Sequence, residues 1–176
     1  LAALEKAVAV EPASIPVREE LAELYGSLDR RSDRLVQLQL LAGLDRAQPE
    51  RQVALALAHA RAHRYELAAL TLGNALERST NDTALYAALG RVWLEAARVR
   101  EDDREAIAKA RDALSHAAAD PNVTSDILTL YGRALLQNAE HGTAERVLRQ
   151  ATSTFPLDPE SLPLYATAAE HERHER

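Results

Sequence analysis

His59 and His63 are the side chains whose types and spacing come closest to a metal site. Residues four apart on a helix share one face, so two imidazoles could reach the same ion. Zinc needs further ligands, the chain has no cysteine, and no nearby carboxylate completes a tetrahedral set. His59 also takes a predicted packing position. We therefore interpret it as a core residue and expect no metal and no cofactor.

The other reactive side chains do not form a catalytic pattern. A nucleophile needs a base and an orienting group within hydrogen-bond reach, and the sequence shows no spacing at which known sites supply them. Serine, threonine and aspartate fall mostly in predicted turns and helix caps, and none of the six glycines belongs to a phosphate-binding loop. His171 and His174 stand in a charged terminal run. We expect that the chain is not an enzyme by itself.

The elements that must position any site are predicted to be helices. Of the 176 residues 47% are hydrophobic, enough for a continuous core, and only 4% are aromatic. Alanine and leucine dominate over valine and isoleucine, so helix formers are abundant and strand formers are scarce. The composition therefore predicts an all-α fold.

Charge and hydropathy exclude two kinds of partner. A net charge of −6 gives no basic footprint, so we expect no nucleic acid partner. No apolar run approaches the roughly eighteen residues of a membrane span, so we expect no direct membrane insertion. The lack of cysteine suits a soluble chain in either the cytoplasm or the periplasm, and localisation stays open. Because the chain starts at Leu1 and has no methionine, we expect a fragment, with any targeting signal outside it.

The stretch from Leu128 to Pro156 contains the most complete copy of a recurring helical pattern. Its apolar residues are spaced three and four apart in two groups, and the segment 138–142 breaks the pattern between them. The pattern comprises Leu128, Tyr131, Gly132, Leu135, Ala144, Leu148, Ala151 and Pro156. It predicts a hairpin of two antiparallel helices, which needs neighbours to bury its apolar faces.

Copies of this hairpin recur along the chain. Small residues of the first helices are separated by 34, 34, 42 and 34 positions: Ala22, Ala56, Gly90, Gly132 and Ala166. We expect glycine or alanine there to let the two helices of a hairpin approach closely. Two insertions of four residues, near 98–104 and 119–123, account for the extra length. The predicted repeats are 15–48, 49–82, 83–120 and 125–158, with a single second helix at 1–14 and a single first helix at 159–176.

The period and its residues resemble the tetratricopeptide repeat (TPR) family, along essentially the whole chain. The first-helix pattern is matched by Tyr86, Leu89, Gly90 and Trp93, and the second-helix pattern by Ala144, Leu148, Ala151 and Pro156. Departures from the family pattern occur at Arg34, His59, Thr80 and Ala118. The resemblance implies a right-handed superhelix of stacked hairpins forming one domain over 1–176. The Arg-rich, Ala-rich, imperfect repeats favour a bacterial protein.

In the TPR family the first helices line a concave groove that holds a partner peptide or helix. Following the family's register, the candidate partner-binding residues are Leu57, Arg61, Arg91, Leu94, Leu130, Arg133 and Leu136. The predicted groove columns contain no lysine or asparagine, which argues against the family's clamp for a C-terminal carboxylate. Arg91 and Arg133 share one column. They fit a carboxylate-bearing partner, and the alternative is that both pair with acids of the next helix.

These observations predict a protein-interaction scaffold that binds a protein or peptide. The alternative is a regulatory or substrate-presenting arm of a larger enzyme or of a polysaccharide or protein export machine, which the flanking sequence of the gene would distinguish. The single helices at both ends leave stacking faces open, so we also expect self-association through the uncapped ends, or fraying at one end.

Overall fold

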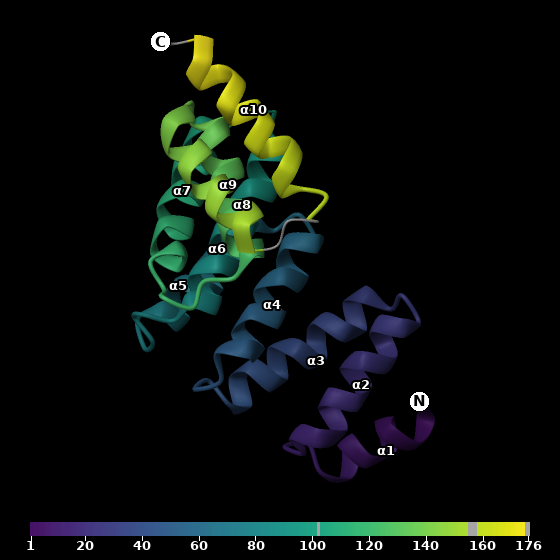
Figure 1. The fold of residues 1–176 in the computed structure, drawn as a ribbon. Helices are drawn as coiled ribbons and strands as arrows, with labels where there is room; N and C mark the ends of the chain where they lie inside the picture. The colour runs from purple at the N-terminus through teal and green to yellow at the C-terminus, as the bar shows by residue number, and fades with distance from the viewer. Residues whose placement is uncertain (102, 155–157, 175–176) are drawn as a thin grey trace. The chain divides into compact units, whose positions relative to one another are not determined.

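A computed structural model describes the backbone of residues 1–101, 103–154 and 158–174 (Figure 1). In these ranges the chain forms ten α-helices and no strand, which confirms the all-α prediction. The helices are α1 (Ala2–Val10), α2 (Ile15–Ser27), α3 (Arg31–Leu44), α4 (Pro49–Arg61), α5 (Tyr65–Leu76), α6 (Thr83–Val99), α7 (Arg104–Ala118), α8 (Ser125–Gln137), α9 (His141–Thr154) and α10 (Ser161–His174).

The chain divides into two compact units, Leu1–Ser79 with helices α1 to α5 and Thr80–Arg176 with helices α6 to α10. Within each unit every helix packs against the next one in the sequence. In the second unit α8 also contacts both α6 and α10. The first helices of successive hairpins, α6, α8 and α10, therefore lie next to one another. That residues 1–176 form one continuous domain stays a prediction.

Local sequence signals explain where the helices begin. Pro16 and Pro49 stand in the first turns of α2 and α4, where a missing N–H costs no hydrogen bond. Asp82 and Asp103 precede α6 and α7, and their carboxylates accept the backbone N–H groups of Leu85 at 3.0 Å and of Ala106 at 3.1 Å. These caps satisfy donors that have no partner inside the helix.

Every hairpin turns through a residue in the left-handed conformation. The φ angles are 52° at Asp29, 57° at His63, 51° at Glu101 and 59° at Ala139. After His63, the N–H of Arg64 donates to the carbonyl of His59 at 3.0 Å, and the turns after Asp29 and Ala139 close in the same way. This is the Schellman closure of a helix end. His63 therefore lies outside α4, and the expectation that His59 and His63 share a helix is wrong.

The first predicted insertion, near 98–104, lies where α6 ends at Val99 and α7 begins at Arg104, and the added length extends helix α6. Helix α6 has 17 residues, whereas α2, α4 and α8 have 13 each. The four additional residues amount to one turn, and two of them, Ala96 and Ala97, are buried. The inserted segment thus adds core contacts to the second unit.

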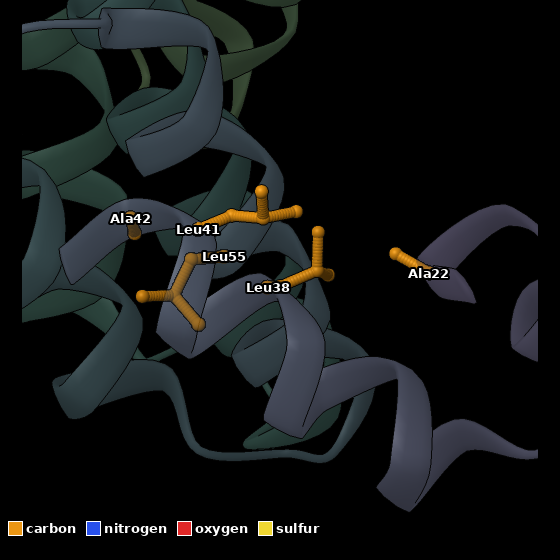
Figure 2. Close-up of a cluster of buried hydrophobic side chains, with 5 residues drawn as sticks. All are labelled: Ala22, Leu38, Leu41, Ala42 and Leu55. Atoms are coloured by element: carbon orange, nitrogen blue, oxygen red, sulfur yellow. The ribbon is translucent and has the colours of Figure 1, made fainter. Parts of the chain in front are cut away.

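Close approach of paired helices shapes the cores. In the second unit, side chains opposite Gly90 and Gly132 occupy the space that a Cβ would need. The core of the first unit includes a cluster of buried side chains from α2, α3 and α4 (Figure 2): Ala22, Leu38, Leu41, Ala42 and Leu55. The predicted packing role of small residues on the first helices is confirmed at Ala22 and Ala56, which are buried, and at the two glycines. It is wrong at Ala166, which is exposed on α10.

Candidate functional site

An open hollow of about 510 Å³ lies on the second unit, and we name it the unit-2 hollow. It is formed by α6, α8 and the turn that precedes α10. The residues lining it are Arg91, Asp126, Thr129, Leu130, Arg133, Asp158, Pro159 and Glu160. Because all three elements belong to one compact unit, the hollow is a property of that unit alone.

Helix α8 supplies one wall of the hollow. Asp126 precedes Thr129 and Leu130 by three and four positions, and these two precede Arg133 by four and three, so all four lie on one helical face. Leu130 is half-buried and packs against the core cluster of the second unit. The wall therefore combines an apolar centre, fixed by the core, with charged residues at both ends.

Asp158 fixes the turn that forms the opposite wall. Its carboxylate accepts the backbone N–H of Glu160 at 3.0 Å and that of Ser161 at 3.2 Å, which caps the start of α10. The buried Thr129 hydroxyl on α8 lies 3.2 Å from the same carboxylate. These bonds, first of all the one from the Glu160 N–H, hold the pKa of Asp158 below its ordinary value. The turn is thus tied to α8 independently of the side chain of Glu160.

The two arginines of the hollow are in different states. Arg133 Nη2 lies 2.7 Å from Glu160 Oε2. Among the residues that the structure describes, no carboxylate lies within ion-pair distance of Arg91, which is exposed on α6. The alternative that both arginines pair with acids of the next helix therefore applies to Arg133, and Arg91 remains open.

Of the candidate groove residues, the structure brings together three: Arg91, Leu130 and Arg133. Leu94 is only 7% exposed and packs in the core beside Leu114. Leu136 is half-buried against a second core cluster, formed by α8, α9 and α10. Leu94 thus belongs to the core of the second unit, and a part of Leu136 in partner binding stays a prediction.

The other two candidates lie on α4 in the first unit. Leu57 is half-buried and Arg61 is exposed. Neither lines the unit-2 hollow, so their part in partner binding stays a prediction.

Sequence reasoning missed the acidic residues of the hollow. Asp126 and Glu160 are 34 residues apart, and both stand at the start of a first helix. The register that placed Arg91 and Arg133 in one column also places these two acids in one column. The signal in the sequence is this shared repeat position, which lies outside the groove positions of the TPR family.

His59 is buried, as expected from its packing position, with 2% exposure. Its Nδ1 atom has no hydrogen-bond partner. Burial is the main reason that its pKa is lowered, and the nearby Arg64 adds to this effect. In the turn after α4, the His63 Nδ1 atom lies 3.0 Å from the Tyr65 hydroxyl. Because the two imidazoles have separate environments, they do not form a common ligand pair.

Neither a metal cluster nor a membrane span is found among the residues that the structure describes. No group of three or more histidine, cysteine, aspartate or glutamate side chains in that part of the chain could hold a metal ion. None of the helices described has both the length and the apolar character that crossing a bilayer requires.

No protein-family model matches the chain, and no curated protein matches it by sequence. Solved structures do match its fold. YrrB, described as a TPR protein with an unusual peptide-binding site, is similar with a TM-score of 0.70 at 15% identity, over 97% of this chain and 84% of that one. TTC0263, a thermophilic TPR protein of Thermus thermophilus, gives 0.70 at 17% identity, over 90% and 83% of the two chains.

A third similar structure is that of pilF from Pseudomonas aeruginosa, with a TM-score of 0.71 at 18% identity, over 89% of this chain and 69% of that one. At these identities the likeness concerns the fold. The chain therefore has a TPR-like helical-repeat fold, which confirms the prediction of tetratricopeptide-like hairpins. A bacterial origin stays a prediction.

Proposed function

We propose that the chain is a protein-interaction scaffold without catalytic activity of its own, and that a partner docks in the unit-2 hollow. The observation that carries this proposal is the open guanidinium of Arg91 beside the apolar surface of Leu130. YrrB, which has a similar fold, is described as having a peptide-binding site, and a peptide-binding role here is in keeping with that.

The chemistry of the hollow favours an amphipathic helix or an extended peptide that bears a carboxylate. Burial of apolar side chains on Leu130 and Pro159 supplies most of the affinity, since apolar burial contributes roughly 25 cal/mol per Å². A carboxylate bound by Arg91 fixes the register of the partner, because a guanidinium can hold it through two parallel hydrogen bonds.

The interactions of the acids that line the hollow determine which charged side chains are available to a partner. Asp158 is engaged by the turn and Glu160 by Arg133. Among the described residues, Asp126 forms no ion pair, and it is exposed. A partner that presents a carboxylate to Arg91 and an N–H donor to Asp126 satisfies both of these side chains. A polyanion such as nucleic acid does not fit this mixture of charges.

The proposal is tested with an array of twelve-residue amphipathic peptides, with and without acidic residues, and affinities measured by fluorescence anisotropy. Arg91→Glu should weaken binding of acidic peptides at least tenfold, about 1.4 kcal/mol, and leave the melting temperature nearly unchanged. Arg98→Glu is the matched control, because Arg98 is an exposed arginine of the same helix that lies outside the hollow.

Two outcomes reject the proposal. One is that no acidic amphipathic peptide binds. The other is that Arg91→Glu and Arg98→Glu weaken binding equally. The effect of Arg91 would then be long-range electrostatic attraction and not direct contact with the peptide. The double change Arg91→Glu and Arg133→Glu extends the test, and a lowered melting temperature with unaltered affinity would assign these arginines to the scaffold.

A further inference from the structure

The unit-2 hollow contains two equivalent pairs of an arginine and an acid. Arg91 and Arg133 are 42 residues apart, as Gly90 and Gly132 are, and they occupy one repeat position. Asp126 and Glu160 occupy another position, each at the start of the next first helix. By the repeat register, Arg91 corresponds to Arg133 just as Asp126 corresponds to Glu160, and all four line the hollow.

The two pairs differ in one respect. Arg133 Nη2 and Glu160 Oε2 are 2.7 Å apart, whereas the structure, over the residues it describes, forms no ion pair between Arg91 and Asp126. Aspartate is shorter than glutamate by one methylene group, so its carboxylate reaches less far from the backbone. The closed pair contains the longer acid and the open pair contains the shorter one.

We propose that side-chain length at this acidic position decides whether the facing arginine is closed by the chain's own carboxylate or is open to that of a partner. Glu160 closes Arg133, and Asp126 leaves Arg91 open. The inference rests on the proposed function and specifies it: the partner's carboxylate goes to Arg91, and Glu160 is an internal competitor for any carboxylate at Arg133.

The local structure allows Glu160 to be exchanged for an external carboxylate. Its backbone is held by Asp158, so the turn does not depend on the Glu160 side chain. The side chains of Arg133 and Glu160 are 36% and 64% exposed, and ion pairs this exposed contribute little to stability. Removing the pair therefore frees Arg133 without unfolding the hollow.

Two substitutions that conserve charge test this inference in opposite directions. Glu160→Asp shortens the acid that faces Arg133, and Asp126→Glu lengthens the acid that faces Arg91. Both keep the net charge, so long-range attraction is unchanged. The probe is hexanoate, whose carboxylate suits a guanidinium and whose alkyl chain suits Leu130 and Pro159; hexanol is the uncharged control. Binding is followed by NMR through the arginine Nε–Hε signals.

In the unaltered protein, hexanoate should shift the Arg91 signal and leave the Arg133 signal in place. Glu160→Asp should make the Arg133 signal respond and raise the affinity for hexanoate about two- to fivefold, the range expected when an exposed ion pair no longer competes. Asp126→Glu should lower the affinity by a similar factor and should silence the response of Arg91.

The inference is overturned if the Arg133 signal ignores hexanoate in Glu160→Asp, or if Asp126→Glu leaves the Arg91 response intact. Both of these outcomes leave the proposed function standing, provided that Arg91 responds in the unaltered protein. If neither arginine responds in the unaltered protein or in Glu160→Asp, the hollow does not take carboxylates, and the inference and the proposed docking site fail together.

Discussion

Leu114 of α7 packs so closely against Gly90 of α6 that a Cβ on the glycine would lie 2.8 Å from the leucine Cδ2 atom. Leu114 has no exposed surface and belongs to a buried core cluster of the second unit. Gly132 and Leu148 repeat this relationship in the next hairpin. Each hairpin of the second unit thus depends on a glycine for the approach of its two helices.

Adding a methyl group at these glycines should destabilise the protein. We expect Gly90→Ala and Gly132→Ala to lower the free energy of unfolding by about 1–3 kcal/mol through overpacking. Gly73→Ala on α5 is the control, because nothing lies within 4 Å of its added Cβ, and the better helix propensity of alanine should raise stability by about 0.5–1 kcal/mol. Urea unfolding measures both effects, and equal signs would contradict the packing argument.

The capping turn at Asp158 should make stability sensitive to acid. The folded-state pKa of Asp158 lies below the ordinary value of 3.8, so its carboxylate contributes stability above about pH 4, and this is lost as the pH falls through the lowered pKa. Asp158→Ala should cost about 1 kcal/mol at neutral pH and less at pH 2. Urea unfolding between pH 2 and 7 checks this. Asp126→Ala is the control, because it removes an exposed acid and leaves the Asp158 cap in place.

His59 should also make stability fall in acid, over a higher pH range than Asp158 does. Its folded-state pKa lies below 6.5, so the unfolded chain binds a proton more readily, and stability falls as the pH drops from about 6.5 toward the folded-state pKa. His59→Tyr should be tolerated or stabilising and should remove this component. Thermal unfolding of both proteins at pH 5 and pH 8 measures it. A large loss of stability in His59→Tyr that excess zinc had been preventing would reverse our interpretation of His59.

Helix α1 should be the least protected helix of the first unit. It has no buried residue, Val10 is 86% exposed, and its side-chain bonds to α2 include the one that Tyr25 donates to Glu5 at 2.9 Å. We expect fast amide exchange in α1, or association that depends on concentration and covers its apolar residues. Hydrogen exchange and light scattering test this, and a strict monomer with protected α1 amides would refute it.

The repeat register made much of the fold predictable. Gly90 and Gly132 stand 42 residues apart because four residues were inserted twice between them, and their shared role in packing follows from their position alone. Each hairpin repeats the same helical spacing of apolar residues and the same small residue between its helices. A single sequence therefore contains several copies of the signal that predicts the fold. The fate of the first insertion was not predictable, because a polar segment such as 98–104 suits a loop as well as one more turn of helix.

The candidate site was predictable only in part. Arg91, Leu130 and Arg133 were found because the register places them on first helices. Leu94 was misplaced as a surface residue, since an apolar side chain near a groove and one in the core look alike in sequence; its burial depends on contact with α7. The ion pair of Arg133 and Glu160 depends on side-chain geometry between α8 and the turn that precedes α10, and the two residues are 27 positions apart in the sequence.

The glycine contacts and the arginine pair also differ in what a duplication of repeats would preserve. Gly90 and Leu114 belong to one hairpin, so a copied or transplanted hairpin retains its own packing contact. Arg133 and Glu160 belong to successive hairpins, so any exchange creates a new pairing at the junction. Stability would be inherited within a repeat, whereas the charge that a partner meets would be reassigned each time the order of repeats changes.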